Sequence, residues 1–368
     1  MNILYGVQAT GNGHISRSRE IISALKHAGH CVHVILSGRD PALLWDMGIF
    51  RPYTVFRGMS LEFERGRLRP FKTALNLPIR QLYRDIGSYR APCAFDVALV
   101  DFEPVTARIA RRLRIPSIGI GHQYAFNYKV PVSKWAPVAR WILRYFAPVD
   151  HAIGLHWHHF GYPILPPVVP QLISAAGAQS KKILVYLPFE QQKDVLQLLG
   201  RFSSHDFYYY TAVSEARDES NVRLRPFSRI GFIADLRSCN GVLCNAGFEL
   251  ASEALHLGKK LLVKPLTGQL EQTSNARALK MLGLADVISS LDAGSVHAWL
   301  ARDPAPAQNY PDVARLIAEW VDRGNWHDTG DLVTRSWRHV TGHEPGTPQD
   351  TRCAQPRSAA FSECCIQK

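Results

Sequence analysis

The sequence of 368 residues lacks the features that mark several whole classes of protein. No run of apolar residues approaches the roughly 18–20 that a membrane-spanning helix needs. The first residues, MNILYGVQ, enter a strand pattern directly, without the basic and then apolar leader of a secretory signal. We therefore expect a cytoplasmic protein whose contact with any membrane is peripheral, on the inner face.

Cysteine is sparse, and patterns typical of metal sites are missing. The seven cysteines are scattered without the paired spacing of a zinc site, so we interpret them as reduced thiols. No Asp-x-Asp pair, which could chelate a cation, occurs in the sequence. His156, His158 and His159 have no carboxylate or cysteine at ligand spacing, which favours packing between domains over a metal. We expect no metal and no cofactor.

Positive charge is distributed unevenly along the chain. Residues 1–160 hold 21 Lys and Arg against 10 Asp and Glu, whereas residues 161–368 hold 22 against 21. Nearly all of the net charge of +12 therefore lies in the first half. This favours an anionic partner, such as a membrane surface or a phosphorylated acceptor. No known nucleic-acid-binding module accompanies the charge, so we expect no nucleic-acid partner.

Two segments, 51–92 and 124–149, carry much of this charge. The second interleaves its cations with Trp, Tyr and Phe, which is the composition of a helix lying at a membrane interface. It is equally the composition of a surface helix that packs its aromatic side chains into the domain core. Both interpretations remain open at this point.

Short apolar strands alternate with amphipathic helices, which predicts an α/β protein with parallel sheets. The clearest stretch is 240–275, where a strand at 242–245 leads through Gly247 into a helix at 248–257 and a strand at 260–263. Further strands are predicted at 2–8, 31–36, 97–100, 117–121, 182–187 and 206–211. A glycine-bearing loop at 9–14 should precede a helix at 16–28. Ligands of such sheets bind beyond the carboxyl ends of the strands.

Candidate catalytic side chains follow the carboxyl ends of the predicted strands in the first half. These are His14, Asp101, Glu103 and His122. Taken alone, each such residue is more often a helix cap, a turn residue or a hydrogen-bonding core residue. The loop with Gly11, Asn12 and Gly13 lacks the third glycine of the dinucleotide fingerprint, so a dinucleotide is weakly supported.

The predicted helix after Gly247 would point free backbone N–H groups and its positive dipole end at the crevice. That makes it a natural seat for a diphosphate. Glu249 and Glu253 stand one turn apart on this helix, where like charges repel. They form either a solvated acidic face or, for Glu253, an acceptor for paired sugar hydroxyls.

Motifs spread from residue 5 to about 290 resemble the GT-B glycosyltransferases: YGVQATGNGHISRSR, VDFEP, GHQYAF, LHWHHFGYPILPP and NAGFELASEAL…GQLEQ…NA. The sequence resembles the bacterial enzymes that add N-acetylglucosamine to the peptidoglycan lipid precursor. It resembles more closely a group of largely uncharacterised bacterial and archaeal glycosyltransferase-like proteins. The resemblance implies two facing Rossmann-like domains, with the acceptor on the first and a nucleotide-sugar on the second.

The resemblance also implies roles for individual residues. Backbone groups at Phe232 and Ile233 would cup a uracil, Glu253 would bind the ribose, and Glu271 departs from the glutamine that the family uses to bind the sugar. The implied donor-binding set is Phe232, Ile233, Gly247, Phe248, Glu253, Gln269, Glu271 and Gln272. The implied acceptor-side set is Gly11, Asn12, Gly13, His122 and Gln123. We rank His14 first as the catalytic base, Asp101 second and Glu103 third, although a carboxylate could equally orient an imidazole.

We therefore predict an acceptor-side domain at 1–152, a linker at 153–180 and a nucleotide-sugar-binding domain at 181–308. Closing helices are predicted at 309–342, before a disordered tail at 343–368. The predicted function is transfer of a sugar, with inversion, from a nucleoside diphosphate to an acceptor hydroxyl. UDP is the first choice of nucleotide, and a lipid-linked acceptor is one option. One alternative is a nucleotide-sugar hydrolase or epimerase, because the segment from Gly11 to Arg17 also resembles hydrolases of activated nonulosonic-acid precursors. The other is a basic, membrane-associated module without enzymatic activity.

Overall fold

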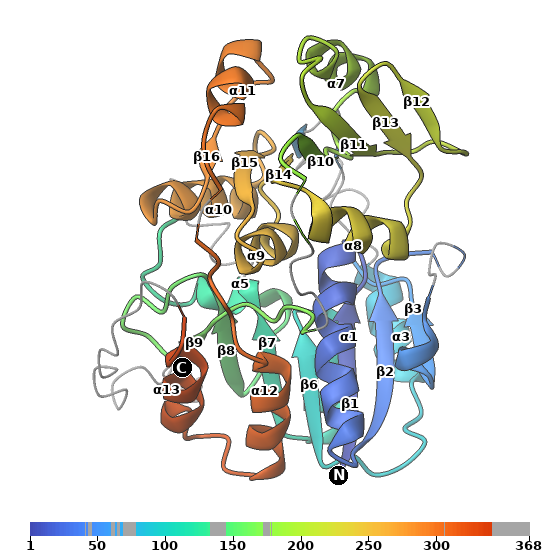
Figure 1. Ribbon diagram of the computed structural model, residues 1–368. Coiled ribbons are helices and arrows are strands. Elements are labelled where there is room, and N and C mark those ends of the chain that lie inside the picture. Colours follow the sequence, from blue (N-terminus) through green and yellow to red (C-terminus); the bar gives the residue numbers. More distant parts are fainter. Residues whose placement is uncertain are drawn as a thin grey trace, which may run out of the picture.

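The computed structural model describes residues 1–40, 42, 46–59, 63–64, 67–68, 79–132, 145–171, 177, 179–304 and 306–340. These residues form two α/β units, one in the lower and one in the upper half of Figure 1. The tail predicted at 343–368 lies outside the described residues. So do the centre of the aromatic and cationic segment 124–149 and much of the cationic segment 51–92.

The first unit is built on a seven-stranded sheet in the order β3-β2-β1-β6-β7-β8-β9. All neighbouring strands of this sheet are parallel. They are β1 (Asn2–Gln8), β2 (Cys31–Ser37), β3 (Tyr53–Phe56), β6 (Val97–Asp101), β7 (Ser117–Gly121), β8 (His151–Leu155) and β9 (Ile164–Leu165). The helical segments are α1 (Asn12–His27), η2 (Gly48–Phe50), α3 (Ile79–Ser88), α4 (Pro104–Leu113) and α5 (His122–Ala125). A small antiparallel pair, β4 (Phe63–Glu64) and β5 (Arg67–Leu68), stands apart from the sheet.

The second unit repeats this design with the order β12-β13-β11-β10-β14-β15-β16. Its strands are β10 (Lys182–Tyr186), β11 (Asp206–Tyr210), β12 (Arg217–Glu219), β13 (Val222–Arg225), β14 (Gly241–Asn245), β15 (Lys260–Lys264) and β16 (Asp286–Val287). Only the edge pair β12 and β13 is antiparallel among them. The helices are α7 (Gln192–Leu199), α8 (Arg229–Ser238), α9 (Phe248–His256), α10 (Leu270–Met281) and α11 (Ala293–Leu300). The central strands are buried on both faces, as expected where helices cover a parallel sheet on both sides.

Two C-terminal helices, α12 (Val313–Asp322) and α13 (Gly330–Trp337), return to the first unit, as predicted. They lie beside its sheet at the bottom of Figure 1. Helix α12 packs against α1. The indole Nε1 of Trp337 donates a hydrogen bond to the carbonyl oxygen of Ile164 in β9 (2.7 Å). The chain therefore passes between the two units twice.

The predicted strands and helices match the structure closely in the stretch 240–275, but three predictions are wrong in detail. Helix α1 begins at Asn12, so Gly13 and His14 belong to its first turn and not to a loop. Strands β8 and β9 lie in or overlap the predicted linker at 153–180 yet pair with the first sheet. The third difference concerns α8.

Residues 229–238 form helix α8, where the sequence suggested a loop that cups a base. Ser228 caps the helix by accepting a hydrogen bond from the Gly231 N–H, and the Phe232 N–H donates to the Ser228 carbonyl (2.9 Å). The Phe232 ring packs edge-on against Tyr186 and Tyr210, which favours the helix despite the internal glycine. The predicted loop is therefore wrong, whereas the base contact predicted for Phe232 and Ile233 stays a prediction.

Candidate active site

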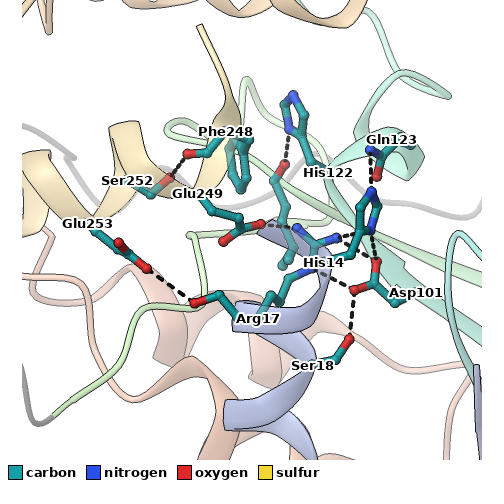
Figure 2. Close-up of polar contacts among 12 residues, drawn as sticks. His14, Arg17, Ser18, Asp101, His122, Gln123, Phe248, Glu249, Ser252 and Glu253 are labelled. Carbon is teal, nitrogen blue, oxygen red and sulfur yellow. Dashed lines mark hydrogen bonds and ion pairs between the residues drawn. The ribbon is translucent and has the colours of Figure 1, made fainter. Parts of the chain in front are cut away.

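The candidate site lies where the carboxyl ends of the first sheet face α9 of the second unit. His14 stands in the first turn of α1, Asp101 ends β6, and Gln123 lies in α5 directly after β7. Across the boundary, α9 begins at Phe248. Figure 2 shows the side chains of α1 and the strand ends pointing toward those of α9. Residues far apart in the sequence therefore meet at the position expected for the ligand of a parallel sheet.

Asp101 is the centre of the polar contacts, and its side chain is fully buried. Its Oδ2 accepts hydrogen bonds from Ser18 Oγ (2.8 Å) and Arg17 Nε (3.3 Å). Its Oδ1 accepts one from Arg17 Nη2 and lies 2.9 Å from His14 Nδ1. Burial alone would raise the pKa of Asp101, but Arg17 and then His14 outweigh it and lower the pKa to about 2. Asp101 is therefore an ionised carboxylate at neutral pH.

The contact with Asp101 decides which nitrogen of His14 carries the proton. An imidazole that faces an ionised carboxylate through Nδ1 donates from that nitrogen, so we assign the Nδ1–H tautomer. The lone pair of Nε2 then remains available, and the Gln123 side-chain nitrogen lies 3.5 Å from it. The His14 side chain is 16% exposed, which leaves it accessible. A carboxylate that orients an imidazole in this way prepares it to accept a proton.

Arg17 joins the two units at this site. Its Nη1 donates to Oε1 of Glu249 on α9, and its side chain is only 2% exposed. Burial would lower the pKa of Arg17, but Asp101 and Glu249 raise it, so the guanidinium stays charged. Burial raises the pKa of Glu249, against the downward pull of Arg17. Gly13 permits this close approach, because a Cβ there would lie 2.7 Å from the Glu249 side chain.

Glu253 lies one turn beyond Glu249 and also faces α1. Its Oε1 accepts a hydrogen bond from Ser16 Oγ (3.3 Å). Burial raises the pKa of Glu253 to about 7, and the bond from Ser16 lowers it by less. Because both carboxylates meet α1 and Glu249 is buried, the interpretation of a solvated acidic face is wrong.

His122, which was predicted to contact the acceptor, is fully buried. Its Nε2 lies 2.6 Å from Oδ1 of Asn275 on α10, and its Nδ1 lies 2.8 Å from the Leu155 carbonyl oxygen. The ring stacks on Phe248 at 4.0 Å between centroids. Burial lowers the pKa of His122. His122 and Phe248 thus form packing between the units.

Glu103 does not join the site, although it was a candidate base. It caps α4, where its two carboxylate oxygens accept the N–H groups of Val105 (2.8 Å) and Thr106 (2.6 Å). Ser37 Oγ donates a third hydrogen bond (2.6 Å). Burial raises the pKa of Glu103, while these hydrogen bonds lower it by less. These hydrogen bonds give Glu103 a structural role as the cap of α4.

The predicted donor-binding residues lie in three different settings. Around Gly247 the space is open: a Cβ there would meet nothing within 4 Å, and no side chain caps α9. Gln269 and Gln272 instead shape the loop before α10, because Gln269 accepts from the Gln272 N–H and Gln272 accepts from the Leu266 N–H. Glu271 faces the first unit, where its Oε2 accepts from Gln123 Nε2 (3.0 Å).

The acceptor-side glycine segment has a similar division. Gly11 precedes α1, and a Cβ there would meet nothing within 4 Å. Asn12 is engaged, because its Oδ1 accepts from Arg39 Nη1 (2.8 Å). Gly13 is covered by Glu249, as described above. Of the two glycines, only Gly11 therefore borders open space, while Asn12 is exposed but tied to Arg39.

Sequence reasoning missed Arg17, Ser18 and Asn275 as site residues. A helix that starts at Asn12 puts residues three and four positions after His14 on the same face, which would have indicated Arg17 and Ser18. No local signal indicates Asn275, because its contact with His122 depends on how the two units meet.

Among the residues that the structure describes, no group of three or more His, Cys, Asp or Glu side chains is suited to hold a metal ion. His156 is buried; its ring lies 5.3 Å from the His122 ring, and its Nδ1 accepts from the Trp157 N–H (2.9 Å). The packing role predicted for His156 is therefore confirmed.

A cavity of about 750 Å³ lies away from His14 and Asp101, at the amino ends of β7 and β8, with Arg111 and Trp326 in its lining. In the described parts of the chain, no helix is long and apolar enough to cross a membrane.

Comparisons with known proteins agree with this architecture. The model of glycosyl transferase family 1 matches residues 1–304. No curated protein matches the chain. UGT89C1 of Arabidopsis thaliana, complexed with UDP, has 13% identity, covers 91% of this chain and 99% of its own, and has a TM-score of 0.58.

Two further solved structures have the same fold. LpCGTa in complex with UDP is 16% identical to this chain, and the match covers 91% of this chain and 98% of LpCGTa, with a TM-score of 0.57. The glycosyltransferase SnogD from Streptomyces nogalater is 16% identical, and the match covers 89% of this chain and 96% of SnogD, with a TM-score of 0.53. At such identities the likeness shows the fold, whereas the family match spans most of the sequence. The chain therefore belongs to glycosyl transferase family 1 and is a glycosyltransferase with the GT-B fold of two facing Rossmann-like domains.

Proposed function

We propose that this glycosyltransferase transfers a sugar, with inversion, from a nucleoside diphosphate to an acceptor hydroxyl. The observation that carries the proposal is the contact of 2.9 Å between His14 Nδ1 and the buried carboxylate of Asp101, at the edge that faces α9. UDP is our first choice of nucleotide, because UGT89C1 and LpCGTa were solved with UDP.

In the proposed reaction, His14 acts as the general base. Its Nε2 takes the proton of the acceptor hydroxyl while the acceptor oxygen attacks the anomeric carbon from the side opposite the diphosphate. The bond between the anomeric carbon and the diphosphate oxygen breaks, and its electron pair leaves with the nucleoside diphosphate. Asp101 remains ionised and stabilises the imidazolium that forms. A general base of this kind contributes roughly 10²–10⁴-fold to the rate.

The amino-terminal end of α9 is the proposed seat of the departing diphosphate. The open space at Gly247 and the lack of a side-chain cap leave the first N–H groups of α9 free to donate. Positive partial charge at this helix end would stabilise the negative charge that develops on the leaving group, without a metal. Glu253 and Glu271 remain our proposals for the ribose and the transferred sugar.

We further propose a lipid-linked acceptor at an anionic membrane. Helix α3 of the basic first half exposes Ile79 (53%) and Tyr83 (66%), with Arg80 and Arg84 exposed beside them. Apolar and cationic side chains on one exposed face are typical of helices that rest on anionic lipid. Docking on the inner face would present the active-site edge to an acceptor held in the membrane.

Donor binding and product analysis together test the function. In a thermal-shift screen of nucleotide-sugars, a donor at about 100 times its Kd should stabilise the protein by roughly 2.7 kcal/mol. Failure of every uridine nucleotide to stabilise the protein would overturn the choice of UDP. The donor that binds is then incubated with and without a panel of hydroxyl acceptors. A sugar released into water at the same rate in both cases would identify a hydrolase and overturn transfer.

A further inference from the structure

We propose that Arg17 is a positioning residue that couples closure of the two domains to the orientation of the catalytic pair His14 and Asp101. The proposal rests on the proposed function of that pair, but it assigns a task to a residue that does not touch the reacting atoms. Its basis is one guanidinium shared between carboxylates of different domains, which Figure 2 shows.

Arg17 uses three nitrogen atoms on these two carboxylates. Nε and Nη2 donate to Oδ2 and Oδ1 of Asp101, and Nη1 donates to Glu249. All three side chains are buried. Charges act on each other more strongly away from water, and loss of one partner leaves another charge uncompensated. The contact between Arg17 and Glu249 is therefore strong, and it exists only when α9 lies against α1.

The rotation of the guanidinium matters because Arg17 and His14 share one acceptor. Arg17 Nη2 and His14 Nδ1 both reach Oδ1 of Asp101 and lie 3.1 Å apart. Both nitrogens are donors in the assigned tautomer, so they repel each other. Glu249 holds Nη1 on the far side of the guanidinium. Without Glu249, Arg17 is free to turn fully onto Asp101 and to compete with His14 for Oδ1.

The two carboxylates are not equivalent. Asp101 has Ser18 and His14 as further partners, whereas in the described part of the chain Arg17 alone donates to the Glu249 side chain. Glu253 repels Glu249 as well. Arg17 therefore keeps Asp101 ionised, and Glu249 responds to the closing of the domains.

Removal of the Arg17 charge should leave Asp101 with burial as the dominant influence, so that it takes up a proton at a higher pH. A protonated Asp101 can no longer hold the Nδ1–H tautomer of His14. Two other titratable groups near Asp101, Tyr5 on β1 and Tyr124 on α5, stay uncharged at neutral pH because burial raises their pKa values. Glu249 on α9 also faces Asp101; burial raises its pKa, and its ion pair with Arg17 lowers it.

The test compares Arg17→Met, Arg17→Lys and Glu249→Gln with Arg229→Met as a matched control. Arg229 also crosses between the domains, toward Glu20 (3.9 Å) and Asp46 (4.0 Å), but it does not touch Asp101. Two-bond ¹H–¹⁵N correlation spectra of protein with ¹⁵N-labelled histidine report the tautomer of His14, and they need no substrate. The His14 signal is identified by its loss in His14→Gln.

We expect the native protein and Arg229→Met to hold neutral His14 as the Nδ1–H tautomer, since Asp101 is ionised and accepts from Nδ1. Arg17→Met should show less of that tautomer at the same pH. Glu249→Gln should raise the donor KM several-fold and should reduce the Nδ1–H tautomer and kcat by less than Arg17→Met does, because a more weakly held Arg17 competes with His14 for Oδ1. Arg17→Met should lower kcat by at least about tenfold, with Arg17→Lys between it and the native protein.

An unchanged His14 tautomer in Arg17→Met, or equal effects in Arg229→Met, would overturn the proposal. If Arg17→Met does not fold, the other two variants decide. A native donor KM in Glu249→Gln, together with a native His14 tautomer in Arg17→Lys, would also overturn the proposal. Failure of the proposed function looks different. In that case His14→Gln would keep its activity, whatever the tautomer of His14 in the Arg17 variants.

Discussion

Trp157 of the first domain donates a hydrogen bond from its indole Nε1 to Oγ of Ser252 on α9 (2.8 Å), and both side chains are buried. Ser252 in turn donates to the Phe248 carbonyl oxygen (2.7 Å) in the first turn of the same helix. The helix proposed to hold the diphosphate is therefore fastened to the opposite domain at its first turns. This contact allows a direct prediction.

Trp157→Phe should lower the free energy of unfolding by about 1–3 kcal/mol, because it removes a buried hydrogen bond. It should also weaken donor binding, since α9 loses its attachment. Trp326→Phe is a matched control: the Trp326 indole donates to the Val321 carbonyl oxygen within the C-terminal helices (3.0 Å). Chemical denaturation and calorimetry with UDP measure both effects. Equal loss of UDP affinity in the two variants would contradict the attachment.

The catalytic assignment is tested by His14→Ala, Asp101→Asn and Glu103→Gln. We expect the first two to lower kcat by roughly 10²–10⁴-fold, because one removes the base and the other its orienting carboxylate. Glu103→Gln should keep kcat and lower stability by about 0.5–2 kcal/mol, as for a weakened helix cap. Steady-state kinetics and thermal unfolding separate the two outcomes. A collapse of kcat in Glu103→Gln with native stability would restore Glu103 as a candidate base.

Glu253→Ala should weaken nucleotide-sugar binding by about 1.5–3 kcal/mol if its carboxylate binds the ribose. Ser16→Ala removes the only side-chain donor to Glu253 seen among the described residues and leaves the carboxylate in place. It should therefore leave donor affinity within about threefold of native. Isothermal titration calorimetry measures both variants. An equal loss in Ser16→Ala would show that Glu253 acts through the contact between domains.

Stability should depend on pH through Glu253. Burial raises its pKa in the folded protein to about 7, above the value of 4.5 for the free side chain. Folding therefore favours the protonated form: the stability it contributes is complete below pH 4.5 and declines as the pH rises through about 7. We expect the unfolding midpoint to fall more steeply between about pH 5 and 8 in the native protein than in Glu253→Gln. Parallel curves would contradict this.

Membrane docking is tested by flotation with liposomes. Native protein should float with anionic vesicles at low salt and detach as salt rises, since charges act over only about 8 Å at physiological ionic strength. Ile79→Ser combined with Tyr83→Ser should reduce flotation while leaving activity toward a soluble acceptor unchanged. No binding to anionic vesicles at low salt, or equal binding to neutral ones, would defeat the idea.

The fold could be predicted because its signals are local. Short apolar strands and the helix after Gly247 follow from the order of residues. The rule that ligands bind beyond the carboxyl ends of parallel strands directed attention to Asp101, which ends β6. The same rule selected Glu103, whose side chain caps α4. The following Pro104, at the first position of a helix, indicated a cap there.

The candidate site was harder to predict because its contacts join distant parts of the chain. Arg17 and Glu249 are 232 positions apart, and no periodicity connects them. The burial of His122 depends on Phe248 and Asn275 of the other domain, which a reading of its own motif does not reveal. Side chains at a domain boundary are therefore the ones that local patterns describe least well.

The return of α12 and α13 to the first domain also limits how the enzyme can move. With a connection after β9 and a second one before α12, the domains are joined at two points, and the natural motion is rotation about the line between them. Such a hinge moves α9 toward or away from α1 along one path and disfavours sliding or twisting. Each cycle of opening and closing would then bring Glu249 back to Arg17 in the same register.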